Sequence, residues 1–510
     1  MNHSENPDQD VSYWERRVDT ALFYVLVGLV ALIPLLLRAI SFHRTSPTIT
    51  GSIVLDTGRT TDVVQYRFGL FLICAAFAFL AVLYKVWILR QQLPAHPIHL
   101  PILIFAFCVG ISQLLSPFPT VAYAGFHDLR QGTLTYLACV ILLFAAAHIQ
   151  LRSEQTAWFV FALVPYTVVD TVLCTLDFYG FDTLRVPAVM SFIYPEKLGI
   201  RVPDHLKLST VLANRDYSSG FGAVCSVVFL TCALTDKNIR RRILFLFLAL
   251  GGFTIVLTSL AASGFVTLVC VAPMIIWVAW KYGDGKATVR IGTAAVLGFL
   301  LLHQILQRHN AGIWDETFGF WHSLRPGPRH QEVVSDDRLI SAPKTQPDGA
   351  FRLPEISEPG QSAASGRVYI WKRALALIRQ CPISGFGLDT FAYALPQTER
   401  GRILEFGGDN AIITKPHNLY VHLAYGSGIP ALLAFLATML VIAWRCLRTV
   451  WAGMKVQPFL AAMMIGWFAY LIQALVNDPT IETAPVFWIL SGVLAGAFNS
   501  DKLSTCSKTG

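Results

Sequence analysis

Residues 20–37 read TALFYVLVGLVALIPLLL, a run in which no side chain is charged. A helix of this length is long enough to cross the hydrocarbon core of a bilayer. The residues before it are polar and mixed in charge, and no small-residue cleavage site follows it. We therefore expect an uncleaved first transmembrane helix rather than a signal peptide.

The composition of the whole chain has the same character. Apolar residues make up 54% of its 510 positions and charged residues 14%, whereas soluble domains carry about 25% charged residues. A soluble protein with so few charges would expose large apolar patches and aggregate. The composition therefore indicates an integral membrane protein, and we expect membrane lipid, not nucleic acid, around its net charge of +8.

Apolar stretches of spanning length recur along the chain. They lie near 19–40, 68–89, 100–118, 133–149, 156–177, 218–235, 241–258, 262–280, 289–307, 423–444, 457–477 and 483–499. They predict an all-α polytopic membrane protein with about twelve transmembrane helices. The two tails, 1–18 and 500–510, then lie on one side of the membrane, and the bias of Lys and Arg among the short loops predicts that this side is cytoplasmic.

One long loop, 308–416, separates the predicted helices of 19–307 from those of 417–499, and this orientation places it outside the cytoplasmic membrane. Its part at 326–360 is rich in polar residues and predicts poor order. Ser365 can then cap an amphipathic helix over about 366–380, which we expect at the membrane interface with its apolar side down. The apolar residues of that side are Ile370, Trp371, Ala374, Leu375 and Ile378.

Polar residues at the ends of the predicted helices gather on the same outer side. They are Asp170, His303, His417, His422, Gln473 and Asn477, with Arg130, Asn214, Arg215 and Asp216 in the adjoining loops. Ionisable groups at membrane depth are costly and are candidates for function. Helix ends near lipid headgroups also tolerate polar residues, which is the simpler explanation for any one of them. Their common side predicts a functional site at the outer face.

Metal and disulfide chemistry find little support in the sequence. Most of the ten cysteines lie in apolar runs, and only Cys381 falls firmly in an outer loop. The spacing of Cys and His does not match a zinc site. The acidic pair at 336–337 falls in the polar part of the long loop, where we expect it to be solvated. We therefore expect no bound metal.

Three stretches resemble the O-antigen ligase and polymerase superfamily: SGRVYIWKRAL at 365–375, PISGFGLDTF at 382–391 and KPHNLY at 415–420. In that family an Arg opens a helix in the large periplasmic loop, a Pro and a Gly-x-Gly turn follow, and a His-Asn pair begins the next spanning helix. The matching positions here are Arg367, Pro382, Gly385, Gly387, His417 and Asn418, with Gly428 at the family's later glycine.

Other parts of the chain resemble the family less closely. Arg130 and the Asn214–Tyr217 segment look like its early outer loops. The family's Ser-Arg-Gly appears only as Ser263–Gly264, without the Arg, and Ala431 is a mild departure. One basic contact of the family is therefore absent here or supplied elsewhere.

The resemblance implies a GT-C-like fold and an inverting glycosyltransferase that needs no metal or cofactor. Its donor would be a polyprenyl-diphosphate-linked glycan, and its acceptor a hydroxyl of a glycolipid or polysaccharide, at the outer face of the cytoplasmic membrane. Guanidinium groups bind phosphate oxygens bidentately and stay charged, which suits Arg367, Arg130 and Arg215. An imidazole can take the acceptor proton near neutral pH, which suits His417.

Further residues of the motif complete the candidate site. Lys415, Asn418 and Tyr420 are candidates for substrate binding. We expect His422 to point about 140° away from His417 on a common helix, since each residue turns the helix by about 100°. The simpler explanations are that Arg367 contacts lipid phosphate and that His417 caps a helix.

Four functions remain open on the sequence. An O-antigen ligase would join the glycan to a surface acceptor, and a polymerase would use a second lipid-linked glycan. A protein O-oligosaccharyltransferase of the same superfamily would use protein hydroxyls. A flippase or transporter is the alternative from another class, but it predicts broken helices in matched halves and polar residues at the midplane.

Overall fold

The computed structural model describes residues 7–44, 58–126, 129–152, 154–195, 206–319, 366–397, 412–454 and 456–498. Its helices are α1 (Pro7–Leu32), α2 (Gln65–Leu83) with the π-helical η1 (Tyr84–Ile88), α3 (His99–Leu115), α4 (Pro119–Ala124), α5 (Thr133–His148), α6 (Gln155–Phe161), α7 (Val164–Phe178), η2 (Thr183–Arg185), α8 (Pro187–Ile193), α9 (Arg215–Thr235), α10 (Ile239–Thr258), α11 (Ala262–Tyr282), α12 (Gly285–His309), α13 (Gly312–Glu316), α15 (Arg367–Gln380), α16 (Phe391–Ala394), α18 (Leu419–Trp451), α19 (Pro458–Gln473) and α20 (Ala484–Ala497).

Each predicted apolar stretch overlaps one of these helices. Within the described ranges, seven helices are long and apolar enough to cross a membrane: Gln65–Ile88, Gln155–Phe178, Arg215–Thr235, Ile239–Thr258, Ala262–Tyr282, Gly285–His309 and Leu419–Trp451. Four shorter apolar helices are α3, α5, α19 and α20. The structure is thus mainly helical and fits a polytopic membrane protein, while the number of twelve crossings and their direction stay predictions.

Two predicted stretches differ from the structure because of proline. The first helix was expected to reach residue 40, but α1 ends at Leu32, two residues before Pro34, since the residue before a proline avoids the helical conformation. The stretch at 156–177 is divided at Ala162 and Leu163, and α7 restarts with Pro165 in its first turn.

The prediction of an all-α chain is wrong in one loop. Strands β1 (Ile40–Arg44) and β2 (Gly58–Asp62) form an antiparallel pair between α1 and α2. The hydropathy pattern could not show this ribbon, because its residues are too few and too polar for a clear alternation.

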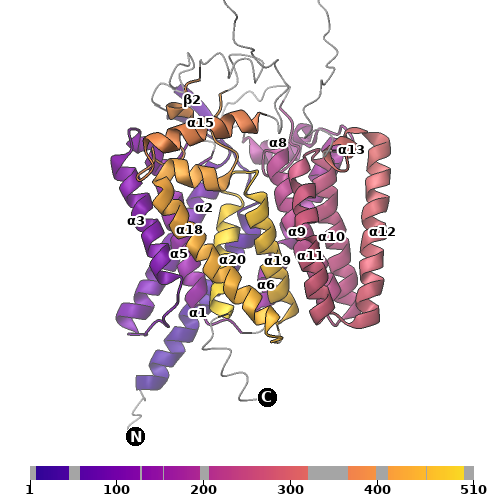
Figure 1. Cartoon of the computed structure of the whole chain (residues 1–510), viewed down its shortest axis with the longest axis horizontal. Helices are drawn as coiled ribbons and strands as arrows, with labels where there is room; N and C mark the ends of the chain where they lie inside the picture. Colours follow the sequence, from indigo (N-terminus) through magenta and orange to yellow (C-terminus); the bar gives the residue numbers. More distant parts are fainter. Residues whose placement is uncertain are drawn as a thin grey trace, which may run out of the picture.

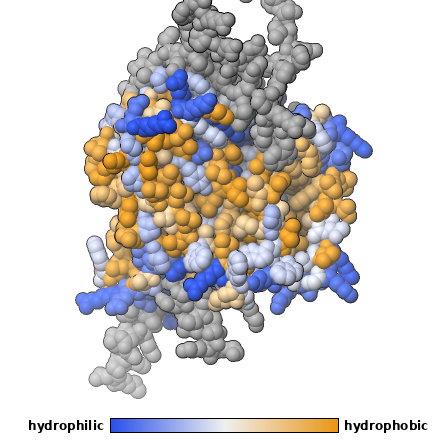
Figure 2. Space-filling model, in the orientation of Figure 1, coloured by the Kyte–Doolittle hydropathy of each residue, from blue (hydrophilic) through white to orange (hydrophobic). Residues whose placement is uncertain are grey.

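The long helices lie side by side, and α15 lies across one end of them (Figure 1). We call this end, where α9, α18 and α20 begin and α19 ends, the α15 end. The helix α9 is buried along nearly its whole length between α10, α11 and α19. Figure 2 shows a hydrophobic band across the middle of one face, with hydrophilic residues at both ends. Such a surface suits a bilayer rather than water.

Candidate functional site

A docking of backbone on backbone holds the loop motif in place. The helix α18 is interrupted at Gly428, where φ is +84°. The backbone around the interruption forms hydrogen bonds with the segment 382–387. Phe386 N donates to Tyr425 O (3.0 Å), Gly387 N donates to Gly426 O (2.9 Å), and Ile429 N donates to Pro382 O (2.8 Å). A Cβ at Gly428 would clash with the carbonyl of Ile383. The two backbones can therefore lie this close together only because the motif has glycine at Gly385 and Gly428, where a Cβ would clash.

The helix α15 begins at Arg367, in agreement with the predicted span of 366–380. Its cap position is Gly366, with φ +79°, while Ser365, the predicted cap, lies outside the described residues. The apolar side packs against protein, where Ile370, Ala374 and Ile378 join a buried cluster that includes Tyr425 of α18. The expectation of an apolar side against lipid is thus wrong, and Leu375 leaves that side, with 50% of its surface exposed.

Arg367 points to the start of α9. Its Nη2 donates to Asp216 Oδ2 at 3.0 Å, and the guanidinium is mostly buried while the carboxylate is 41% exposed. Asp216 is held in the first turn of α9 by the cap residue Asn214, whose side chain accepts from the Asp216 amide at 2.8 Å. A carboxylate at a helix N-terminus is stabilised by the helix dipole.

His417 lies outside α18. Its φ is +53°, and Asn418 is the cap that precedes the helix. His417 Nδ1 lies 3.0 Å from Asp478 Oδ2, and the amide of Asn418 donates to Asp478 Oδ1 at 3.2 Å. The predicted angle of about 140° between His417 and His422 is therefore wrong, because the two residues do not share a helix.

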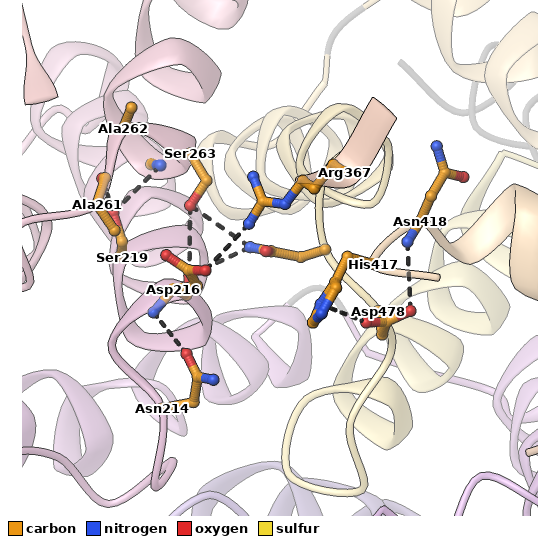
Figure 3. Close-up of polar contacts among 12 residues, drawn as sticks. Asn214, Asp216, Ser219, Ala261, Ala262, Ser263, Arg367, His417, Asn418 and Asp478 are labelled. Atoms are coloured by element: carbon orange, nitrogen blue, oxygen red, sulfur yellow. Dashed lines mark hydrogen bonds and ion pairs between the residues drawn. The ribbon is translucent and has the colours of Figure 1, made fainter. Parts of the chain in front are cut away.

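The contacts of Arg367 with Asp216 and of His417 with Asp478 are neighbours at the α15 end (Figure 3). Asn477, next to Asp478 in the chain, donates from Nδ2 to the backbone oxygen of Asp216 at 3.2 Å. The Lys415 ammonium lies 4.6 Å from the centre of the Tyr217 ring, one residue from Asp216. Thus the guanidinium of Arg367, the ammonium of Lys415 and the imidazole of His417 lie at the same end of the helices, beside residues from distant parts of the chain.

Two other predicted substrate-binding residues serve α18 itself. Asn418 Oδ1 accepts from the amides of Tyr420 and Val421, and its Nδ2 donates to Leu475 O at 2.7 Å. The Tyr420 hydroxyl donates to Leu471 O at 2.8 Å. These contacts tie the start of α18 to the end of α19, and so position the residue before them, His417.

Arg130 and Arg215 have partners of their own. Arg130 Nη2 bonds Asp62 Oδ2 at 2.9 Å and Gln65 Oε1 at 2.7 Å. Arg215 Nη2 bonds Asp177 Oδ2 of α7 at 2.7 Å, and its side chain is 52% exposed. Arg215 therefore pairs with Asp177, whereas Asp216, the next residue in the chain, pairs with Arg367.

Other predicted polar candidates have structural contacts. Asp170 accepts from the hydroxyls of Tyr166 and Thr210 and from the amide of Val211. His303 Nε2 lies 2.9 Å from the hydroxyl of Thr317, after α13. These residues join helices to the loops at their ends, as helix-end polar residues commonly do.

The sequence analysis missed three acidic residues. Asp478 and Glu482 lie in the turn after α19. Glu482 Oε1 accepts from Nη1 of the fully buried Arg67 at 2.7 Å. Asp389 lies in the loop motif, and its Oδ2 accepts from the amides of Phe126 (2.6 Å) and Gln131 (3.0 Å). Their position next to an apolar stretch was the signal that could have found Asp478 and Glu482, because charged groups near membrane depth are candidates for function.

Asp389 is expected to make stability depend on pH. Burial raises its pKa to about 7, although the two amides oppose the shift. The folded protein then holds a proton that the unfolded chain has lost above pH ~4, so this contribution to stability is present at low pH and disappears as the pH rises through about 7. Replacing Asp389 with Asn should remove a slope of about 1.4 kcal/mol per pH unit between these limits.

The measurement is the free energy of unfolding in detergent at several pH values, for wild type and Asp389→Asn. Asn can keep an oxygen toward the two amides, so the difference between the two proteins isolates the proton. Parallel pH curves for both proteins would contradict a buried, proton-holding Asp389.

The family-model match agrees with the structure. The chain has apolar helices of spanning length, and Arg367, Lys415 and His417 lie at one end of them. These features are typical of multi-pass membrane proteins with a polar site at the helix ends. Residues 243–436 match the family model described as O-antigen ligase. This match confirms the resemblance to the O-antigen ligase and polymerase superfamily, whose members are membrane glycosyltransferases.

The matched segment contains Arg367, Lys415, His417 and Gly428, whereas Arg130 and Arg215 lie before it. No curated protein sequence matches the chain. The polar stretch at 326–360 and the acidic pair at 336–337 lie outside the described residues.

Proposed function

We propose that this protein is an O-antigen ligase-type glycosyltransferase in surface polysaccharide biosynthesis. It transfers a glycan from a polyprenyl diphosphate to an acceptor hydroxyl at the outer face of the cytoplasmic membrane. The observation that carries the proposal is the meeting of Arg367 and His417, each with its own carboxylate partner, within the segment that matches the family.

Arg367 is the group that binds the donor diphosphate. In the absence of substrate its guanidinium is paired with Asp216, whose carboxylate is partly exposed and can give way to phosphate oxygens. The leaving diphosphate gains negative charge as its bond to the sugar breaks, so a fixed guanidinium binds it more strongly in the transition state than before. Lys415 adds a second positive charge close by.

His417 is the general base. Asp478 lies against Nδ1, which orients the ring and leaves Nε2 for the acceptor hydroxyl. The acceptor oxygen forms a bond to the anomeric carbon, and its proton goes to Nε2. The bond from that carbon to the diphosphate breaks with its electron pair, so one displacement inverts the configuration. This displacement needs no covalent nucleophile on the protein and no metal.

The site lies on the extracytoplasmic side in this proposal, with the polyprenyl chain in lipid. Arg130 and Arg215 are the remaining substrate-binding candidates, and both would first have to leave Asp62 and Asp177. A cysteine introduced at Ser362 should react with an impermeant reagent added to intact cells. Failure to label it, with a cytoplasmic position reachable under the same conditions, would contradict this side.

The experiment that tests the activity uses purified protein, a polyprenyl-diphosphate-linked glycan and an acceptor. Wild type should release free polyprenyl diphosphate, and Arg367→Ala should lose about 10²–10³ of kcat/KM, the usual cost of removing one preorganised electrostatic group. Arg379→Ala is the matched control, because it removes an exposed arginine from the same helix. Equal release by Arg367→Ala and wild type would contradict the mechanism.

The acceptor decides among the enzyme alternatives. A ligase needs a surface glycolipid or polysaccharide, a polymerase elongates with a second lipid-linked glycan, and an O-oligosaccharyltransferase modifies protein hydroxyls. A transporter would move the lipid-linked glycan across vesicles without releasing polyprenyl diphosphate.

A further inference from the structure

A group of buried polar atoms beside the proposed site has no hydrogen-bond partner within the described part of the chain. The atoms are Nε2 and Oε1 of Gln131, Oγ1 of Thr133, Oη of Tyr136, Oδ1 of Asp389 and both ring nitrogens of His422. Each of these five side chains is at most 3% exposed. The catalytic mechanism above uses none of them.

These side chains converge from three parts of the fold. Thr133 and Tyr136 are three residues apart at the start of α5 and so share one side of it. The Tyr136 ring is stacked on that of His422 in α18, with centroids 6.1 Å apart. Oδ2 of Asp389 accepts from the backbone amide of Gln131 at 3.0 Å. The five residues therefore form one cluster and not scattered exceptions.

The cluster adjoins the pair of His417 and Asp478. The backbone amide of His422 donates to Asn418 O at 2.9 Å. Asn418 follows His417 in the chain, and its own backbone amide donates to Asp478 Oδ1 at 3.2 Å, while Asp478 Oδ2 lies 3.0 Å from His417 Nδ1. A ligand in the cluster would therefore lie next to the proposed general base.

Buried polar groups in proteins nearly always have a partner, either protein or ordered water. One unpaired atom can be tolerated, but several together would carry a large unfavourable free energy, because each has lost its bonds to water. An occupant that is not part of these residues would supply the missing bonds.

The types of atom indicate the chemistry of that occupant. Gln131 offers donors and acceptors, each hydroxyl can do both, and a neutral His422 ring offers one of each. A phosphate group would bring acceptors but no donor for the acceptor atoms of Gln131 and His422, and a lipid chain would satisfy nothing. A hydroxyl group both donates and accepts, as the cluster requires.

We propose that Gln131, Thr133, Tyr136, Asp389 and His422 form a hydroxyl-binding site next to His417. The hydroxyls come either from a sugar ring of the substrate or from ordered water. The sugar source rests on the proposed function, whereas the water source does not.

The test removes one hydroxyl and keeps its ring. Tyr136→Phe leaves the stacking on His422 intact, and Thr133→Val, which preserves shape, is the second variant. Tyr282→Phe is the matched control, because it also removes one tyrosine hydroxyl. This hydroxyl donates to Met454 O at 3.0 Å, at the end of α11 away from the α15 end. Thermal unfolding without substrate and KM for donor and acceptor are measured for all three.

If water is the source, Tyr136→Phe lowers Tm as much as the control does, and KM is unchanged. If a sugar is the source, KM for the donor or the acceptor rises about tenfold, the effect of one lost hydrogen bond of ~1.4 kcal/mol. A Tm that rises or stays unchanged, together with an unchanged KM for both substrates, would overturn the proposal. A wild type without transfer would refute the proposed function alone, since the Tm comparison needs no substrate.

Discussion

Replacing His417 with alanine is expected to lower kcat for glycan transfer by a factor of about 10²–10⁴, the usual contribution of a general base. The imidazole lies outside α18 with Nδ1 against Asp478, so its loss removes the proposed proton acceptor without interrupting a helix. In the proposed mechanism, donor binding depends on Arg367 instead. We therefore expect KM for the donor to change little, whereas Arg367→Ala should raise it.

Added imidazole should restore part of the activity of His417→Ala, because the side chain is 31% exposed and leaves a space that solvent reaches. The control is His309→Ala, an exposed histidine at the end of α12, which should transfer glycan at the wild-type rate. Release of polyprenyl diphosphate that continues unchanged in His417→Ala would refute its role as the base.

Replacing Gly428 with alanine is expected to destabilise the fold by about 3 kcal/mol or more, in the range typical of strain at a special backbone position. Two effects add here. The combination of φ +84° and ψ 167° costs a residue with a Cβ about 1–3 kcal/mol, and the new Cβ would also clash with the carbonyl of Ile383. The clash would separate the 382–387 segment from the kink in α18.

Gly453→Ala separates these two effects. Gly453 has a similar φ of +74°, but a Cβ there meets nothing within 4 Å, so the variant should show only the backbone cost. Thermal unfolding in detergent should give a clearly larger fall in Tm for Gly428→Ala. Equal shifts for the two variants would mean that the docking of the loop on α18 contributes nothing to stability.

Much of the helical framework could be predicted from hydropathy alone. A bilayer requires runs of apolar residues of a minimum length, and that requirement is local, so α9, α11 and α12 begin and end close to the predicted boundaries. The motif that begins at Arg367 was also readable, because the family resemblance depends on residues close together in the chain. The ribbon of β1 and β2 and the early end of α1 at Leu32 were not found by hydropathy.

The sequence by itself determined that this protein is built from membrane-spanning lengths of apolar helix, and it offered Arg367 and His417 as candidates for its site. Only the tertiary structure decided their partners. Asp216 and Asp478 lie 151 and 61 positions from Arg367 and His417, and the local sequence does not tell which of many carboxylates will pair with each. Packing of α9, α15, α18 and α19 decides this, because a charge at the edge of the apolar region is stable only beside the opposite charge that the fold brings to it.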